Sequence, residues 1–119
     1  MFLAMDLACI LFGVAALFGA TMFLWRLITH SNPPRYAAFL HGLVILCAFG
    51  TLVYAALTGP HPQNAWMALL ALSLAATAGG YLAFVDHKNE LLQVDQVAVH
   101  GAFALTGYTA LCVLTLATH

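Results

Sequence analysis

Charged residues are what this sequence has least of. Only three lysines and arginines and four acidic residues occur among 119, so charged side chains make up 6% of the chain and the formal net charge is -1. A soluble domain carries about 25% charged residues, so this composition cannot cover a surface that faces water. The shortage of basic residues also argues against nucleic acid as a partner and against a basic patch for anionic lipids.

Motifs for hydrolytic or nucleotide chemistry are missing as well. The sequence contains no glycine-rich phosphate loop, nucleophile elbow or HExxH. The interiors of its apolar runs lack carboxylates, which argues against a proton-driven transporter with an acidic relay. Cys9, Cys47 and Cys112 show no CxxC spacing, and each lies in an apolar run, where a small buried residue is the simplest interpretation. A disulfide between Cys9 and Cys112 is an alternative, because both are expected near the same membrane face.

Four long apolar runs take up most of the chain. Hydrophobic residues make up 64% of it, and the mean hydropathy is +0.97. Runs of about 20 apolar residues are long enough to cross a bilayer, and the short breaks between them make consecutive helices antiparallel neighbours. We therefore predict an all-α fold, an integral membrane four-helix up-down bundle that forms one transmembrane domain over residues 1–119. The helices are expected at about residues 5–29, 34–57, 64–85 and 94–117, with Asn64 as the N-cap of the third.

The few basic residues predict an orientation in the membrane. Arg26 and Arg35 flank the first break and Lys88 lies in the third, whereas the second break and both termini have no lysine or arginine. The positive-inside rule places the first and third breaks in the cytoplasm. We therefore expect a protein of the bacterial inner membrane with both termini periplasmic.

A histidine followed by glycine occurs inside both the second and the fourth apolar run. His41-Gly42 and His100-Gly101 are separated by 59 positions, and the same shift aligns several apolar residues. This repeat predicts an internal duplication of a two-helix unit. A histidine in hydrocarbon costs free energy unless it has a partner, so these two residues mark a function or a specific contact.

Two histidines at matching depth on different helices are the minimal ligand set for a b-type haem. We predict that His41 and His100 are the iron ligands, and that Arg35, with Arg26 and Lys88 nearby, meets the haem propionates. Such a site would pass electrons to or from quinone or a larger redox complex. The small residues expected to leave a slot for the macrocycle are Gly42, Gly101, Ala48 and Gly107. The aromatic residues expected to pack against it are Phe39, Phe49, Phe103 and Tyr108.

In outline the chain resembles small four-helix b-type cytochromes of the cytochrome b561 kind, and bacterial membrane proteins with a repeated His-Gly helix pair. The likeness extends over the whole chain, and its motif is the His-Gly pair itself. A di-haem core of the b561 type needs four intramembrane histidines, whereas this sequence offers two. The resemblance therefore implies one haem at most.

Two other interpretations remain open from the sequence. In the first, each His-Gly pair is a helix crossing at which Gly42 or Gly101 lets backbones approach and the histidine bonds a neighbouring helix. The protein would then be a cofactor-free accessory or assembly subunit that docks onto other membrane subunits. In the second, the protein is a small transporter or channel, which would require oligomerisation, and no helix carries the polar stripe that would favour it.

A group of acidic and imidazole side chains lies around the third break. Such a group could bind a metal or relay protons, and a solvated loop is the simpler interpretation. Its members are Asp86, His87, Glu90 and Asp95.

Overall fold

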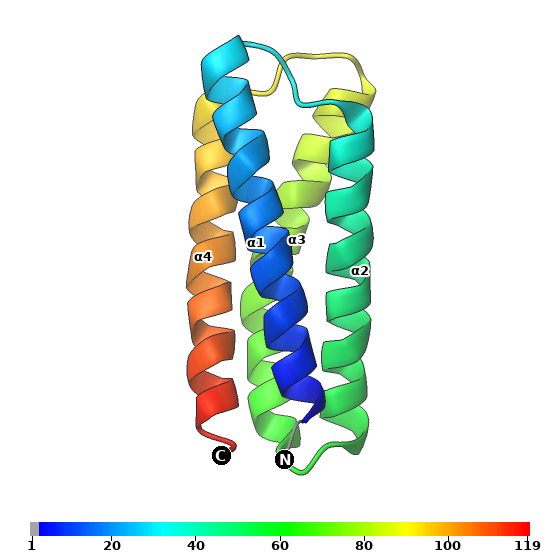
Figure 1. Cartoon of the computed structure of the whole chain (residues 1–119), viewed down its shortest axis with the longest axis vertical. Coiled ribbons are helices and arrows are strands. Elements are labelled where there is room, and N and C mark those ends of the chain that lie inside the picture. Colours follow the sequence, from blue (N-terminus) through cyan, green and yellow to red (C-terminus); the bar gives the residue numbers. More distant parts are fainter. Residues whose placement is uncertain (1–2) are drawn as a thin grey trace.

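The computed structural model describes residues 3–119 and consists of four long antiparallel helices (Figure 1). They are α1 (Ala4–Thr29), α2 (Arg35–Thr58), α3 (Pro62–His87) and α4 (Val94–Leu116). Helix α1 packs against α2 and α4, and α3 packs against the same two helices, so α2 and α4 lie diagonally across the bundle. The bundle measures 45 × 20 × 20 Å. The predicted all-α four-helix up-down bundle is confirmed.

The outside of the bundle is apolar along its length. All four helices are long and apolar enough to cross a membrane. Large apolar side chains such as Leu17, Leu70 and Leu116 are more than 70% exposed. Continuous apolar surface of this extent indicates a lipid bilayer environment, where helices satisfy their backbone hydrogen bonds internally.

The third helix begins two residues earlier than expected. Pro62 occupies its first turn, where a missing N–H leaves no hydrogen bond unmade, and His61 precedes it. Asn64 is therefore not the N-cap. Its side-chain amide instead donates to the Leu114 carbonyl of α4 over 3.3 Å, which ties α3 to α4.

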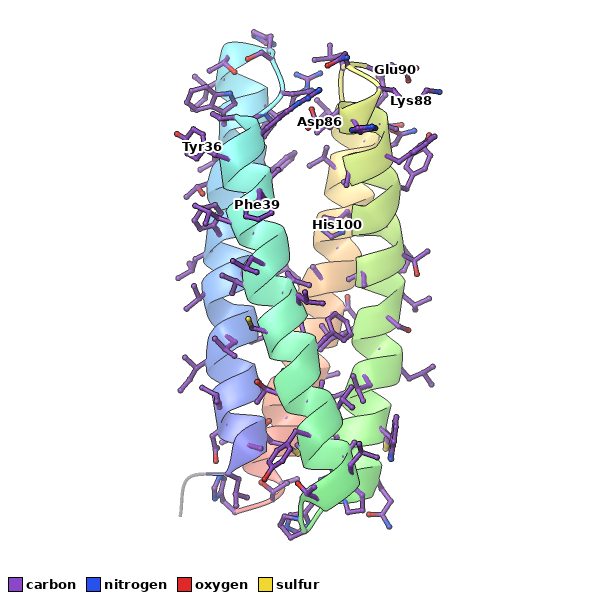
Figure 2. All side chains as sticks on the ribbon, turned by 90° about the vertical axis from the view of Figure 1, so that its right-hand side faces the viewer. Tyr36, Phe39, Asp86, Lys88, Glu90 and His100 are labelled. Atoms are coloured by element: carbon purple, nitrogen blue, oxygen red, sulfur yellow. The ribbon has the colours of Figure 1, made fainter. Side chains whose placement is uncertain are left out.

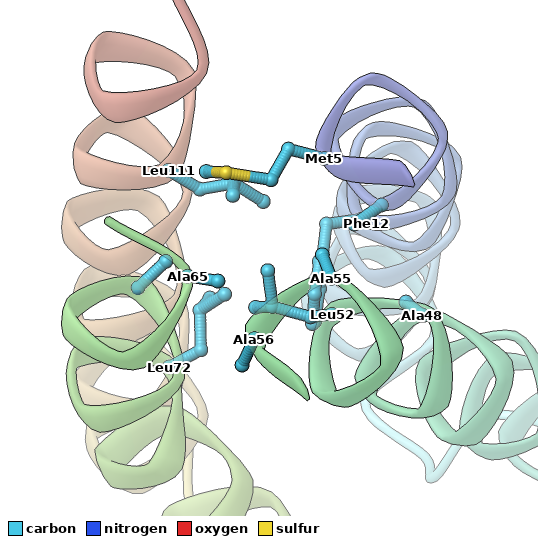
Figure 3. Close-up of a cluster of buried hydrophobic side chains, with 11 residues drawn as sticks. Met5, Phe12, Ala48, Leu52, Ala55, Ala56, Ala65, Leu72 and Leu111 are labelled. Atoms are coloured by element: carbon cyan, nitrogen blue, oxygen red, sulfur yellow. The ribbon is translucent and has the colours of Figure 1, made fainter. Parts of the chain in front are cut away.

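The main core fills the half of the bundle that carries both termini and the α2–α3 loop, which we call the terminal half (Figure 3). The alanines that α1, α2 and α3 contribute to this core are small enough to let the backbones come close, and leucines fill the space that is left. Leu52 and Leu111 are the largest fully buried side chains among the described residues. The buried cluster consists of Met5, Ala8, Phe12, Ala48, Leu52, Ala55, Ala56, Ala65, Ala68, Leu72 and Leu111.

The opposite half, which we call the histidine half, contains His41, His100 and the α1–α2 and α3–α4 loops. Its packing is looser. Within the described chain, no residue of α2 from Arg35 to Cys47 and none of α4 from Val94 to Thr106 is buried. A small cluster of Leu82, Val85 and Leu92 lies where α3 and its following loop meet. Helices α2 and α4 therefore face the interior here through partly exposed side chains.

Hydrogen bonds join the two loops at this end of the bundle, at the top of Figure 1. The Asn32 side-chain amide donates to Asp86 Oδ1 over 2.9 Å and to the Glu90 carbonyl over 2.8 Å. Its oxygen accepts the Leu92 N–H over 2.9 Å. Buried Arg26 donates from Nε to the Leu92 carbonyl over 2.8 Å. Hydrogen bonds thus hold the helices together at this end, where few apolar side chains are buried.

Candidate functional site

The two histidines occupy equivalent places, since each is the seventh residue of its helix. Each imidazole lies against a glycine of the preceding helix. A Cβ added to Gly19 would come 3.3 Å from Cε1 of His41, and one added to Gly79 would come 2.9 Å from Cε1 of His100. Each ring therefore uses the space that the missing glycine side chain leaves on α1 or α3. Figure 2 shows His100 in the histidine half, below the loop that carries Lys88 and Glu90.

His100 is oriented by a backbone carbonyl. Its Nδ1 lies 2.9 Å from the carbonyl oxygen of Ala75, which is one turn before Gly79 on α3. Because a carbonyl oxygen can only accept, Nδ1 carries the proton and Nε2 keeps its lone pair. Histidines that bind metals commonly have this arrangement, in which a backbone carbonyl fixes the tautomer and the ring orientation.

His41 lies over its glycine in the same way, but its hydrogen bonding is incomplete. The Ala15 carbonyl, one turn before Gly19, faces the ring. Yet Nδ1 of His41 is buried without a partner in hydrogen-bond geometry, and within residues 3–119 no other buried side-chain polar atom lacks one. The Phe18 ring stacks beside the imidazole, with the ring centroids 6.4 Å apart. An unpaired buried polar atom costs about 1–3 kcal/mol, so His41 is held in this position at a cost in stability.

His41 and His100 belong to helices α2 and α4, which lie diagonally across the bundle. Each imidazole in its neutral form has one nitrogen lone pair that can bind a ligand such as a metal, whereas a protonated ring has none. The site is therefore suited to a ligand that imidazole nitrogen binds, such as a metal centre.

The glycines that follow the histidines do not contribute to this packing. A Cβ added to Gly42 or Gly101 would meet nothing within 4 Å. The close approach of helices beside each imidazole occurs at Gly19 and Gly79 instead. The helix-crossing role expected for Gly42 and Gly101 is therefore wrong, because both face away from the neighbouring helices.

The slot expected two turns deeper is filled by protein. Ala48 is fully buried in the core of the terminal half. A Cβ added to Gly107 would come 2.9 Å from Cδ2 of Leu72 and 3.3 Å from the Ala71 carbonyl oxygen. Leu72 therefore occupies the space beside Gly107. A flat ligand would have to lie nearer the histidines, in the loosely packed half.

The basic residues expected near haem propionates lie at the same end of the bundle as the histidines and have protein partners. Arg35 donates to the Asn89 side chain and, over 3.4 Å, to the Asp86 carbonyl. Lys88 pairs with Glu90 over 3.7 Å, and both side chains are more than half exposed. Such surface pairs are weak, so these cations remain able to exchange partners.

The aromatic residues near the imidazoles differ from those expected. Phe39 and Phe103 are 69% and 42% exposed. Phe49 and Tyr108 pack against the core of the terminal half. Phe18 is the aromatic residue that stacks on an imidazole, and the sequence signal that could have found it is its place directly before Gly19.

The acidic and imidazole group at the third break does not bring three potential metal ligands together. Among the described residues, no three histidine, cysteine, aspartate or glutamate side chains are placed to hold one ion. Asp86 accepts the hydrogen bond from Asn32 instead.

The chain matches no family model, no curated protein and no solved structure. The likeness to b-type cytochromes accordingly rests on the helix outline and on the two histidines.

Proposed function

We propose that this protein is a small membrane electron-transfer subunit that holds one b-type haem between His41 and His100. One observation carries the proposal: His41 and His100 lie at the same level of two diagonal helices, in the half of the bundle where no described α2 or α4 side chain is buried. Bis-histidine ligation requires two such rings from different helices. The orientation of His100 by the Ala75 carbonyl, which leaves Nε2 available, supports the same assignment.

The residues around the site have distinct tasks in this proposal. Gly19 and Gly79 leave room for the imidazoles, and the Ala75 carbonyl sets the tautomer of His100. Phe18 packs beside His41 and limits its rotation. A bound haem would supply one-electron chemistry at a potential tuned by its axial ligands and its burial.

We further propose that the protein lies in the bacterial inner membrane, with the α1–α2 and α3–α4 loops cytoplasmic and both termini periplasmic. The support is the placement of Arg26, Arg35 and Lys88 at one end of the bundle. The redox partner would be a quinone or a larger membrane complex, because the helices leave little surface outside the membrane for a soluble carrier.

A visible absorption spectrum of the protein purified in mild detergent tests the haem. The wild type is expected to show a Soret band with about one haem per chain, and His41→Ala and His100→Ala are each expected to lose it. His61→Ala is the matched control, because His61 lies in the α2–α3 loop outside the site. Helical, monodisperse wild-type protein without a Soret band, even after expression with added haem precursor, would overturn the proposal.

A cofactor-free accessory subunit is the second candidate, and one observation favours it. Gly19 and Gly79 already accommodate the imidazoles, and the hydrogen bond from His100 to the Ala75 carbonyl can hold α4 to α3 without a ligand. Interhelical hydrogen bonds of this kind contribute about 0.6 to 2 kcal/mol. In that case His100→Ala lowers the thermal midpoint of a colourless protein, and the chain co-purifies with a larger membrane complex.

A further inference from the structure

Cys9 of α1 and Cys112 of α4 bring their sulfur atoms to 3.1 Å from each other in the terminal half, although they are 103 positions apart in the sequence. Non-bonded carbon atoms touch at about 3.5–4.0 Å. A disulfide bond is about 2.05 Å long, so closure requires a movement of only about 1 Å. Both cysteines are free thiols and neither is fully buried.

Contacts beside the cysteine pair set the axial register of α1 relative to α4. The Tyr108 hydroxyl lies 4.0 Å from Cys9 Sγ. A Cβ added to Gly13 would come 2.7 Å from the same hydroxyl oxygen, so the tyrosine fits only because that position is glycine. The third cysteine, Cys47, is exposed on α2 and takes no part in this contact.

The pair lies close to one end of the bundle. Cys9 is five residues from the start of α1 and Cys112 is four residues from the end of α4, which corresponds to about 6 to 8 Å along the helix axes. This end is opposite the loops that carry the basic residues. In the orientation proposed above, this end of the bundle faces the periplasm, where disulfides form and persist.

We propose that Cys9 and Cys112 are a redox-active dithiol that closes to a disulfide between α1 and α4. The oxidant is a disulfide of another protein or a small disulfide. One cysteine thiolate attacks a sulfur of the oxidant and releases the other as a thiolate, and the second cysteine then attacks the mixed disulfide and releases the remaining oxidant thiolate. The two electrons reduce the oxidant disulfide to two thiols, whose thiolates take up the two protons that the cysteines release. The bond joins the first helix to the last.

Thiol counting in native membranes tests this inference, which does not depend on the haem. Membranes are treated with oxidised glutathione, denatured, and labelled with a polyethylene-glycol maleimide that shifts gel mobility once per free thiol. The wild type is expected to change from three labels to one, and Cys47→Ser from two to none. Cys9→Ser and Cys112→Ser are each expected to keep both of their remaining thiols.

Cys47→Ser is the decisive variant, because it leaves the pair intact and removes an exposed residue outside it. The reduced and oxidised forms of this variant are also compared by thermal unfolding, and closure is expected to raise the midpoint by about 5 °C or more, since the bond closes a loop of nearly the whole chain. Retention of both thiols in Cys47→Ser after oxidation would overturn the proposal. So would disulfide bonds that join two chains.

Discussion

The terminal half and the histidine half are built from the same four helices but are held together differently. In the terminal half, alanines and glycine let the backbones approach, and buried Leu52 and Leu111 fill the interior. In the histidine half, no described α2 or α4 side chain is buried, and the helices are joined through Asn32, Arg26 and the His100 imidazole. Apolar packing gives stability, whereas polar groups in hydrocarbon are costly and mark function.

The two halves should therefore respond differently to substitution. A substitution in the terminal half should lower the free energy of unfolding. It should change ligand binding only by reducing the amount of folded protein. A substitution in the histidine half should affect local structure or ligand binding with a smaller effect on global stability. Both expectations can be tested with matched pairs of positions.

The largest effect is expected in the terminal core. Leu111→Ala removes a fully buried side chain and should lower the free energy of unfolding by about 2–5 kcal/mol through lost contacts and a cavity. The measurement is denaturant unfolding in mixed micelles, followed by circular dichroism. Leu105→Ala is the control on the same helix, because that side chain is 62% exposed. Equal losses for the two variants would contradict the assignment of the core.

The next effect is expected at the glycines that face the histidines. Gly79→Ala places a Cβ 2.9 Å from His100 Cε1, so it should displace the imidazole and cost about 1–3 kcal/mol. Gly101→Ala meets nothing within 4 Å and should be neutral or slightly stabilising, since alanine favours a helix. Thermal midpoints of the two variants give the comparison. If Gly101→Ala is the more harmful change, the imidazole does not lie against α3.

A smaller and local effect is expected at the loops. Asn32→Ala removes the hydrogen bonds to Asp86, Glu90 and Leu92. Each contributes about 0.5–1.5 kcal/mol, and part of that is recovered from water at the exposed end. Hydrogen exchange should rise in the α3–α4 loop while the terminal half keeps its protection. Ser31→Ala serves as the neighbouring control, and an increase spread over all four helices would contradict a local role.

The smallest effect is expected at the chain ends. His119 Nε2 lies 2.9 Å from Asp6 Oδ1, and both side chains are partly exposed. Exposed pairs contribute about 0–1 kcal/mol, so His119→Ala should change the thermal midpoint little. A loss as large as that of Leu111→Ala would show that the terminal half depends on this ion pair.

The four helices could be predicted from the sequence because apolar runs of membrane-spanning length are unambiguous and the breaks between them are short. The equal depth of the two histidines followed from the same pattern. The beginning of the third helix was misplaced because Asn64 resembles an N-cap, whereas Pro62 fits the first turn equally well.

The details of the site could not be predicted, because they depend on how neighbouring helices rotate against each other. Gly19 and Gly79 lie 22 and 21 positions before their histidines, and 60 positions separate the glycines where 59 separate the histidines. A single shift therefore does not align both pairs. Gly42 and Gly101 adjoin the histidines in sequence but face away, and Asn32 looks like any loop asparagine until the two loops are brought together.

Electron paramagnetic resonance of the oxidised, purified protein is the most direct test of the central claim. If His41 and His100 bind one iron from opposite corners of the histidine half, the wild type gives a low-spin ferric signal of bis-imidazole type, and either alanine variant converts it to high spin or abolishes it. A folded wild-type protein with no ferric haem signal, or one whose signal survives both substitutions, would contradict the account.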